Sequence, residues 1–286
     1  MQPTYDVIFP ICSIAPSTYL SIESALSQTA PYSCFIAIID CVPEKSQDIL
    51  SALRNIPRLI TLFSVDFNVT GAGPCRQLGI NHSCSDFVAF LDSDDIWHHQ
   101  KSELQLSSLI VGNRKFSFTS YLAVNEYASK VIFASPVYLF RFTHFLLLFF
   151  NPIANSSVIA CRSVLQASGG YSNLLVRNDF QTWIRLLSHL SYGQVSKRNE
   201  FLCLIAKREG SLSSKSKSSI LSFFPLYKSL GYSSLLSLIL SFIFAINFIL
   251  LTRTSRYLSK FLIFIYILYS RRPVLSSFFL SFYSHD

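Results

Sequence analysis

The stretch Phe87–Trp97 (FVAFLDSDDIW) joins a short apolar run directly to three carboxylates. The run Phe87–Leu91 is apolar throughout, which is typical of a β-strand buried on both faces. Asp92, Asp94 and Asp95 follow it at once, and carboxylates grouped at the end of a buried strand are costly unless a cation neutralises them. The stretch therefore predicts a buried strand that delivers a cation site at its carboxyl end.

Upstream of this stretch, short apolar runs alternate with segments of helical spacing. The runs predict buried strands at Tyr5–Ile11, Phe35–Asp40 and Ile60–Val65. Helices are expected between them, at Ser17–Gln28, Ser46–Leu53 and Pro74–Asn81. This alternation is the pattern of a parallel α/β sheet, which binds ligands at the carboxyl ends of its strands. Asp40 and Asp92 both stand at such ends.

The rest of the chain divides into a less regular middle part and a tail. Further strands are expected at Lys115–Val124, Ser156–Cys161 and Phe201–Lys207, and a helix at Asp179–Ser188. The polar, serine-rich segment Glu209–Ser219 is typical of a linker. We therefore expect a catalytic domain at residues 1–215 and a helical tail at residues 216–286.

The chemistry of the acidic stretch favours a hard divalent cation. Oxygen ligands without nearby His or Cys suit Mg²⁺ or Mn²⁺, and Mg²⁺ takes only one or two protein carboxylates before completing its shell with water and substrate phosphates. The acids would then be half a site, with a phosphorylated substrate as the other half. The alternative is a solvated acidic turn that caps a helix at Ile96–Leu109, and the residues alone leave both interpretations open.

Several segments together, in their order along the chain, resemble the family 2 glycosyltransferases. The segments are Val7–Pro10, Tyr19–Thr29, Ile38–Asp40, Gly73–Ile80, Phe87–Trp97, Asn155–Ile159, Gly169–Tyr171, Asn178–Arg185 and Arg208–Ser214. The resemblance implies the GT-A fold, which is a Rossmann-like, mixed but mostly parallel α/β sheet flanked by helices. It also implies an inverting transfer that uses a nucleotide-diphosphate sugar and Mg²⁺ or Mn²⁺.

The resemblance also implies a role for each matching residue on the donor side. Asp92 and Asp94 match the D-x-D pair, with Asp94 as the first candidate for the metal that bridges the donor diphosphate. Asp95 would be an auxiliary acid at the donor. Asp40 matches the acid that contacts the nucleotide base, and Pro10 is expected in the loop beside it.

Two further residues complete the implied site. Arg76 matches a basic residue near the donor, and Asp179 matches the catalytic base that takes a proton from the acceptor hydroxyl. Inversion needs one such base, and a metal can carry the charge of the leaving group. The sequence departs from the family pattern at three positions near the donor, where Ile11-Cys12, Cys41 and Gln77 replace residues that are frequent in the family.

Two other functional classes stay open at this stage. A sugar-phosphate nucleotidyltransferase shares the nucleotide-binding sheet and the metal, but it should carry a Gly-rich basic loop after the first strand, and Ile11–Thr18 has no Gly or Lys. A membrane-docked scaffold with a decayed catalytic domain is the non-enzymatic alternative. Nucleic-acid binding is not expected, because the body has no zinc-finger spacing and no dense Lys/Arg run.

The tail carries a different composition from the body. The chain has 24 Lys and Arg against 16 Asp and Glu, yet only Asp286 of the acids lies beyond Glu209. A basic, apolar tail indicates a membrane surface. We expect no signal peptide and, from seven scattered cysteines, a reduced compartment. The sequence thus places the protein at the cytoplasmic face of the inner or plasma membrane.

The mode of membrane contact depends on the uncharged segment Ser229–Thr252. It is long enough to cross a bilayer. However, serines recur in it at helical spacing, at Ser234, Ser237 and Ser241. Basic residues follow at Arg253, Arg256 and Lys260. This pattern favours helices that lie in the membrane interface, with a single span and a helical pair packed on the catalytic domain as alternatives.

Overall fold

The computed structural model describes residues 4–42, 44, 46–125, 131–135, 147–148, 151–172, 174, 177–207 and 223–246. The strands are β1 Tyr5–Ile11, β2 Phe35–Ile39, β3 Leu59–Phe63, β4 Phe87–Phe90, β5 Ile96–Trp97, β6 Phe116–Asn125, β7 Val131–Ser135, β8 Val158–Cys161 and β9 Val195–Lys207. The helices are α1 Pro16–Leu26, α2 Gln47–Leu53, α3 Ala72–His82, α4 Lys101–Val111, α6 Arg162–Ala167, α7 Asn178–Ser188 and α9 Phe223–Ser229. Short 3₁₀ turns are η2 Ser64–Phe67, η4 Asn155–Ser157 and η5 Tyr192–Gln194. A last helix spans residues 234–246.

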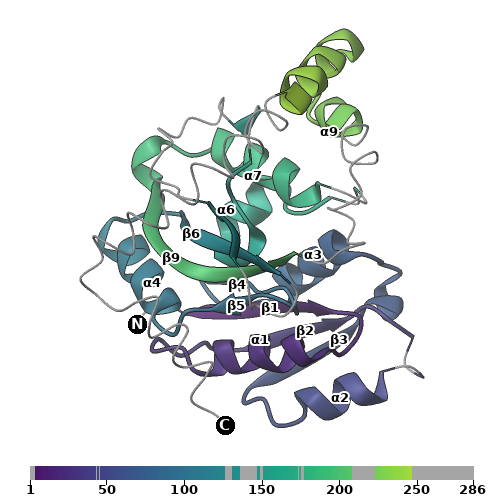
Figure 1. The fold of residues 1–286 in the computed structure, drawn as a ribbon, viewed down its shortest axis with the longest axis vertical. Helices are drawn as coiled ribbons and strands as arrows, with labels where there is room; N and C mark the ends of the chain where they lie inside the picture. The colour runs from purple at the N-terminus through teal and green to yellow at the C-terminus, as the bar shows by residue number, and fades with distance from the viewer. Residues whose placement is uncertain are drawn as a thin grey trace.

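One mixed sheet forms the centre of the molecule (Figure 1). Its strand order is β3-β2-β1-β4-β8-β6-β9-β5, and β7 pairs with β6. Strands β3, β2, β1 and β4 are parallel, as the strand–helix alternation predicts, whereas β8 runs antiparallel between β4 and β6. The mixed, partly parallel sheet therefore confirms the predicted α/β class.

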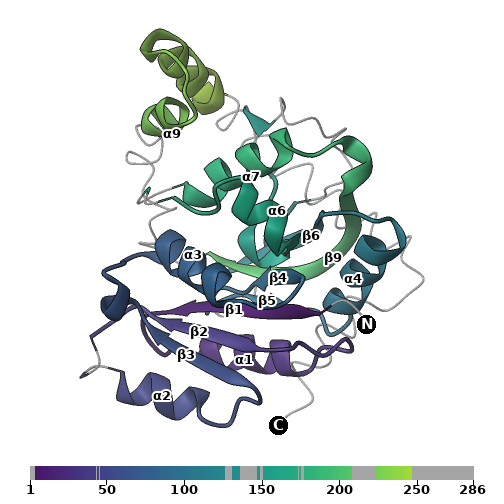
Figure 2. The same ribbon diagram turned by 180° about the vertical axis from the view of Figure 1, so that it is seen from behind.

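Helices cover both faces of this sheet (Figures 1 and 2). Apolar residues of α1, α2 and α4 share one buried cluster with alternate residues of β1 and β2. Residues of α3, α6 and α7 share the other cluster with the remaining strand residues. Since side chains alternate across a strand, a parallel strand buried on both faces needs an apolar residue at nearly every position. This requirement explains the continuous apolar runs in the sequence.

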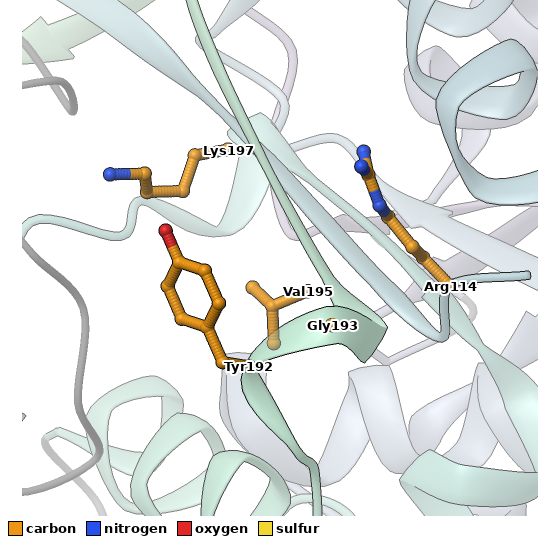
Figure 3. Close-up of a pocket in the computed structure, with 5 residues that line it drawn as sticks. All are labelled: Arg114, Tyr192, Gly193, Val195 and Lys197. Atoms are coloured by element: carbon orange, nitrogen blue, oxygen red, sulfur yellow. The ribbon is translucent and has the colours of Figure 1, made fainter. Parts of the chain in front are cut away.

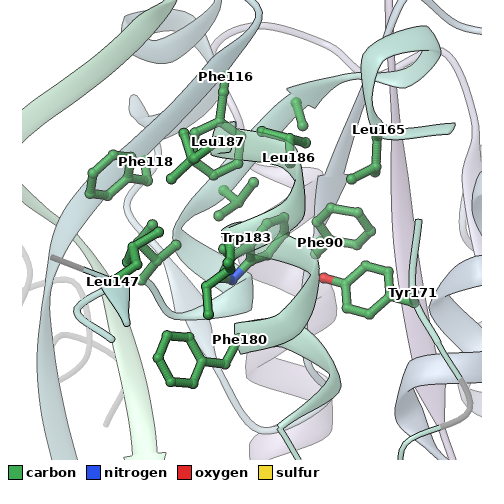
Figure 4. Close-up of a cluster of buried hydrophobic side chains, with 14 of the residues drawn as sticks. Phe90, Phe116, Phe118, Leu147, Leu165, Tyr171, Phe180, Trp183, Leu186 and Leu187 are labelled. Atoms are coloured by element: carbon green, nitrogen blue, oxygen red, sulfur yellow. The ribbon is translucent and has the colours of Figure 1, made fainter. Parts of the chain in front are cut away.

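Helix α7 is anchored by a cluster of aromatic side chains (Figure 4). Trp183 is fully buried, and its ring centroid lies 5.4 Å from that of Phe116, 5.8 Å from that of Tyr171 and 6.1 Å from that of Phe90. Aromatic pairs at these separations are favourable beyond their burial alone. The cluster fixes α7 against β4 and β6, and thereby fixes the position of the residues in its first turn.

The structure corrects the sequence-based placement of Pro10. This residue does not lie in a loop but is buried within β1, where it pairs with Ile38 of β2. Proline lacks a backbone N–H and is rarely tolerated in a central strand. It is tolerated here because the pairing of β1 with β4 ends at Ile8 and Phe90, so the side of the strand that would need that N–H has no ladder partner.

The region after the acidic stretch also differs from expectation. The alternative interpretation of the acidic stretch included a helix at Ile96–Leu109, but Ile96 and Trp97 form β5, paired antiparallel with β9, and α4 begins only at Lys101. β9 is longer than expected and begins at Val195. The linker segment Glu209–Ser219 lies outside the described residues, as does the tail beyond residue 246.

The described part of the tail packs on the catalytic part of the chain. Phe223, Leu226 and Tyr227 of α9 are buried in the same apolar cluster as α7, together with Leu240 and Phe244 from the helix at 234–246. Among the described residues, no helix is both long enough and apolar enough to span a membrane.

Candidate functional site

The predicted acids lie at one edge of the sheet. β1, β2 and β4 are mutually parallel, so Asp40 after β2 and Asp92 after β4 occupy the carboxyl-end edge. The backbone continues the ladder up to the acids, because Leu91 N–H donates to Ile8 O at 3.0 Å and Asp40 N–H donates to Ile11 O at 2.7 Å. Their position is therefore set by the sheet itself.

Arg76 reaches Asp92 from helix α3. The guanidinium of Arg76 is buried and its Nη2 donates to Oδ1 of Asp92, whose side chain is 29% exposed. Burial acts to lower the pKa of Arg76, but the adjacent Asp92 carboxylate outweighs it and raises the pKa above its ordinary value. A buried arginine paired in this way keeps its charge and fixes the orientation of the carboxylate.

Two neighbours complete the surroundings of Arg76. The Tyr171 ring centroid lies 5.6 Å from the guanidinium carbon. With its oxygen toward Arg76, the Asn155 amide accepts from both terminal nitrogens at 3.2 and 3.3 Å and donates to the Tyr171 hydroxyl at 2.6 Å. The two terminal nitrogens of Arg76 therefore have partners on the inner side, and Asp92 is its contact at the sheet edge, while its buried Nε has no hydrogen-bond partner among the described residues.

Asp95 is held by the protein on all sides. It is 4% exposed, its Oδ2 accepts from Ser156 Oγ at 2.6 Å, and its Oδ1 accepts from Ala206 N–H at 2.9 Å. Burial raises the pKa of Asp95 well above its ordinary value, and the charges of Asp94 and Asp92 raise it further. Asp95 is thus an internal anchor of the acidic loop as the structure describes it.

Ser156 connects this anchor to Asp92. Its Oγ accepts from Asp92 N–H at 3.1 Å while donating to Asp95, and its carbonyl accepts from Trp97 Nε1 at 2.7 Å. Behind it, Lys101 Nζ lies 4.2 Å from the Trp97 ring centroid, and burial lowers the pKa of Lys101 to about 8. One side chain therefore bonds to both ends of the loop that carries the acids.

Asp92 and Asp94 are the acids that remain partly accessible. Both have intermediate exposure, in contrast to Asp95. Within the described residues no group of three or more His, Cys, Asp or Glu is arranged to enclose a metal. Two accessible carboxylates nevertheless fit the oxygen-only donor set of Mg²⁺ or Mn²⁺, because such ions take most of their remaining ligands from water and substrate phosphates.

Asp179 lies in the first turn of α7, near the same acids. Burial raises the pKa of Asp179 above its ordinary value, while Arg76 and Arg177 lower it and Asp92 raises it. The geometry agrees, because the start of α3, the helix that carries Arg76, packs at Gly73 against Asn178, the residue before Asp179, and Arg76 pairs with Asp92. The structure therefore brings together three residues that are far apart in the sequence.

Asp40 makes a different set of contacts. Its Oδ1 accepts from Ser64 Oγ at 2.8 Å, and its Oδ2 accepts from Gly71 N–H, also at 2.8 Å. Ser64 follows β3, and Gly71, with φ of +87°, immediately precedes α3. Asp40 thus ties the ends of β2 and β3 to the start of the helix that carries Arg76.

Comparison with known proteins gives this arrangement a family. The model of the glycosyl transferase family 2 matches residues 6–163, more than half of the chain. The chain belongs to glycosyltransferase family 2. The matched residues include Asp40, Arg76 and the acidic loop, whereas Asp179 lies beyond them. Family membership favours glycosyl transfer over the nucleotidyltransferase and scaffold alternatives.

Individual relatives agree with the family. The chain is similar to a putative teichuronic acid biosynthesis glycosyltransferase, TuaG, of Bacillus subtilis, with 28% identity over 65% of this chain and 73% of TuaG. It is also similar to WfaP of Escherichia coli, a UDP-Glc:α-D-GlcNAc-diphosphoundecaprenol β-1,3-glucosyltransferase, with 24% identity over 85% of this chain and 92% of WfaP. Among solved structures, S. aureus TarS residues 1–349 match with a TM-score of 0.62 at 13% identity, over 88% of this chain and 73% of TarS 1–349. This likeness supports the GT-A-like fold.

The sequence alone did not identify the residues that support the acidic loop and Arg76. Asn155, Ser156 and Tyr171 belong to stretches that support the resemblance, but nothing in their spacing from the acids indicates a contact. Ser156 is 61 residues from Asp95 and 64 from Asp92 along the chain. The only signal in the sequence was the position of Ser156 at the start of a predicted strand, at Ser156–Cys161.

A separate pocket of about 220 Å³ lies at the opposite edge of the sheet (Figure 3). Strands β6 and β9 begin there, and both run parallel to β4, so this edge is the one remote from Asp92. Its lining residues are Arg114, Tyr192, Gly193, Val195 and Lys197. None of the predicted site residues is among them.

Proposed function

We propose that this protein is an inverting glycosyltransferase that moves a sugar from a nucleotide-diphosphate donor to a lipid-linked saccharide during assembly of a cell-surface polysaccharide. The observation that carries the proposal is the grouping of Asp92, Arg76 and Asp179 at the carboxyl-end edge of a family 2 sheet. In this proposal a residue that would hold the metal, the cation that orients it and a candidate base would act on the same bound donor and acceptor.

The donor side of the proposed site uses the acidic loop. Asp94 and Asp92 would hold Mg²⁺ or Mn²⁺, which when bound would neutralise charge on the donor diphosphate. Arg76 acts on the donor through the orientation it gives Asp92, and Asp95 keeps the loop in place. Asp40, with Pro10 in the adjacent strand, is proposed to border the nucleotide. A solved complex of the similar TarS 1–349 with UDP-GlcNAc supports a nucleotide-sugar donor.

The acceptor side depends on Asp179. Its carboxylate is proposed to take the proton from an acceptor hydroxyl while that oxygen forms a bond to the anomeric carbon. The bond between the anomeric carbon and the diphosphate oxygen breaks at the same time, and the nucleoside diphosphate leaves with the electron pair. Attack from the face opposite the leaving group inverts the anomeric centre. The raised pKa of Asp179 suits this role, since a base works best with a pKa near the working pH.

The lipid-linked nature of the acceptor is supported by the relatives and by the tail. WfaP is described as acting on a diphosphoundecaprenol-linked sugar, and TuaG as acting in teichuronic acid biosynthesis. Residues 216–286, proposed to form a tail beyond the catalytic domain, are apolar and basic. Peripheral association with the cytoplasmic face of the membrane would give the site access to such an acceptor.

The test is donor turnover by the purified full-length chain. A panel of nucleotide-diphosphate sugars is incubated with Mn²⁺ or Mg²⁺, with and without a lipid-diphosphate-linked sugar, and nucleotide release and the anomeric configuration of the product are measured. Asp179→Asn should lower kcat by about 1,000-fold or more while nucleotide and Mn²⁺ still bind. Asp94→Asn should instead weaken Mn²⁺ binding. If no donor is turned over and Asp94→Asn leaves metal and nucleotide binding unchanged, the assignment is wrong.

A further inference from the structure

The helix at residues 234–246 exposes most of its large apolar side chains. Its inner side consists of Ser237, which is fully buried, and Ser241, which is 6% exposed, together with the buried Leu240 and Phe244. Ser234, the first serine of the predicted stripe, is exposed. The other seven large apolar residues are exposed: Leu235 is 71% exposed, Leu236 40%, Leu238 55%, Ile239 46%, Phe242 67%, Ile243 38% and Ile246 49%. We call these seven residues the outer apolar face. A helix on a water-exposed surface would show the opposite pattern.

The two buried serines can lie on the inner side because both of their hydroxyls have hydrogen-bond partners. Ser241 Oγ donates to Ser237 O at 2.6 Å and Ser237 Oγ donates to Tyr232 O at 3.4 Å, so their hydroxyls are directed to the backbone of their own segment. Small residues of this kind let a helix approach its neighbour closely without an unpaired polar group. Apart from Leu240 and Phe244, the large apolar side chains of this helix are left on the outside.

The inner side of this helix contacts the helix that bears Asp179. Phe244 lies between Phe180 and Phe223, with ring centroids at 5.4 and 3.9 Å. The guanidinium carbon of Arg177 lies 3.6 Å from the Phe223 ring centroid, and Arg177 immediately precedes α7. The two tail helices thus lie at the α7 end of the molecule (Figure 1), and Phe244 contacts Phe180, the residue that follows the candidate base in the sequence.

We infer that the outer apolar face inserts into the interface of a lipid bilayer. Lipid is favoured over a protein partner by charge, because Lys228 precedes the face, Arg253 and Arg256 follow it in the sequence, and no acid lies between Glu209 and Asp286. Anionic headgroups complement the positive charge of such a segment, while the apolar side chains are buried at the boundary between the headgroups and the acyl chains. The inference rests on the proposed function for its purpose, which is to bring a lipid-linked acceptor to Asp179.

The experiment measures vesicle binding by the full-length chain. Vesicles of equal parts phosphatidylglycerol and phosphatidylethanolamine are floated with wild-type protein, with a triple variant of the outer apolar face (Leu235→Ser, Ile239→Ser, Phe242→Ser), and with a control. The control is Val111→Ser with Tyr192→Ser, because these residues are 86% and 69% exposed but lie elsewhere. The triple variant should bind vesicles at least about tenfold more weakly, whereas the control should bind like wild type.

Three results would overturn the inference. Undiminished vesicle binding by the triple variant would mean that another part of the chain docks on lipid. A lower melting temperature of the triple variant without vesicles would mean that residues of the same chain cover the face. A wild-type dimer that the triple variant converts to monomers would mean that a second copy covers it.

The inference can be judged separately from the proposed function. Donor hydrolysis without lipid is measured on the same proteins, and the triple variant should retain wild-type hydrolysis while losing vesicle binding. If wild-type protein binds vesicles through the face but turns over no donor, the docking surface stands and the proposed function fails. If donor turnover is normal and the triple variant binds vesicles like wild type, the proposed function stands and the docking surface fails.

Discussion

At the scale of single residues, the acidic loop depends on a serine that carries no charge. Ser156 accepts from the Asp92 backbone and donates to the Asp95 carboxylate, so it connects the first and last acids of the loop. Hydrogen bonds to charged groups contribute about 1.5–3 kcal/mol each. We therefore expect Ser156→Ala to loosen the loop and to lower kcat/KM and Mn²⁺ affinity by about 10- to 100-fold.

The neighbouring Ser157 provides a matched control for this prediction. Ser157 is also fully buried in η4, but its Oγ donates to Ala154 O at 2.7 Å and contacts neither acid. Ser157→Ala should cost about 1 kcal/mol of unfolding free energy and leave Mn²⁺ affinity unchanged. Equal losses of metal affinity in the two variants would show that the packing of η4, and not the Ser156 hydroxyl, matters.

The second residue-scale prediction concerns the pH dependence that Asp179 confers. A general base must be unprotonated, and burial raises the pKa of Asp179 above its ordinary value. Activity should therefore fall with decreasing pH through a limb that lies above the ordinary Asp range of about 4. The measurement is kcat/KM against pH at saturating Mn²⁺. A profile that stays flat down to about pH 4 would contradict a base with a raised pKa.

At the scale of elements, helices α3 and α7 meet where Gly73 faces Asn178. A Cβ at position 73 would lie 2.3 Å from Asn178 Nδ2, 2.6 Å from its Cγ and 3.0 Å from its Cβ, so alanine cannot enter without a shift of the Asn178 side chain at the start of α7. Gly73→Ala should therefore displace the turn that holds Asp179. We expect kcat to fall by about tenfold or more and stability to fall by about 1–3 kcal/mol, despite the better helix propensity of alanine.

Gly193 is the control for this contact. A Cβ at Gly193 would meet no heavy atom within 4 Å, and its backbone conformation does not require glycine. Gly193→Ala should leave both kcat and the melting temperature near the wild-type values. If Gly73→Ala also behaves like wild type, the two helices do not constrain each other at this contact.

Element prediction from the sequence succeeded where local periodicity decides the structure. The strands and helices up to β4 and the helix α7 were predicted within a few residues, because both faces of a buried strand and one face of a helix leave a pattern in the sequence. β5 was not predicted, and its residues were assigned to a helix in the alternative interpretation, since a two-residue strand is defined only by its partner Leu204–Cys203 in β9. The two paired strands are separated by about 100 residues along the chain, so their pairing leaves no local pattern in the sequence.

The site was predictable to the same limited extent. Asp92 and Asp40 follow from strand ends, and Asp179 and Arg76 follow from the family resemblance rather than from any local rule. The contacts of Ser156, Asn155 and Tyr171 depend on tertiary packing between segments that are distant in the chain. The individual roles of Asp94 and Asp179 remain predictions that the experiments above address.

At the scale of the whole molecule, the described tail helices share the hydrophobic core of the catalytic part. Phe244 is 5% exposed and belongs to the same buried cluster as Trp183 and Phe180. Because this cluster also anchors α7, we expect α9 and the helix at 234–246 to unfold together with the sheet in one cooperative transition. This cooperativity links membrane docking to the position of Asp179.

The prediction at this scale compares two phenylalanines on the same helix. Phe244→Ala removes a ring that packs against Phe180 and Phe223, and it should lower the unfolding free energy by about 3 kcal/mol. Phe242→Ala removes a ring that is 67% exposed, and it should change stability by less than about 0.5 kcal/mol in the absence of vesicles. Denaturant unfolding of the full-length chain, followed by near- and far-UV circular dichroism, measures both. Vesicle binding should show the opposite order: Phe242→Ala should weaken it more than Phe244→Ala does, since Phe242 and not Phe244 lies on the outer apolar face. Equal destabilisation by the two variants would mean that both sides of the helix are packed against protein, and the outer apolar face would then not be available to a bilayer.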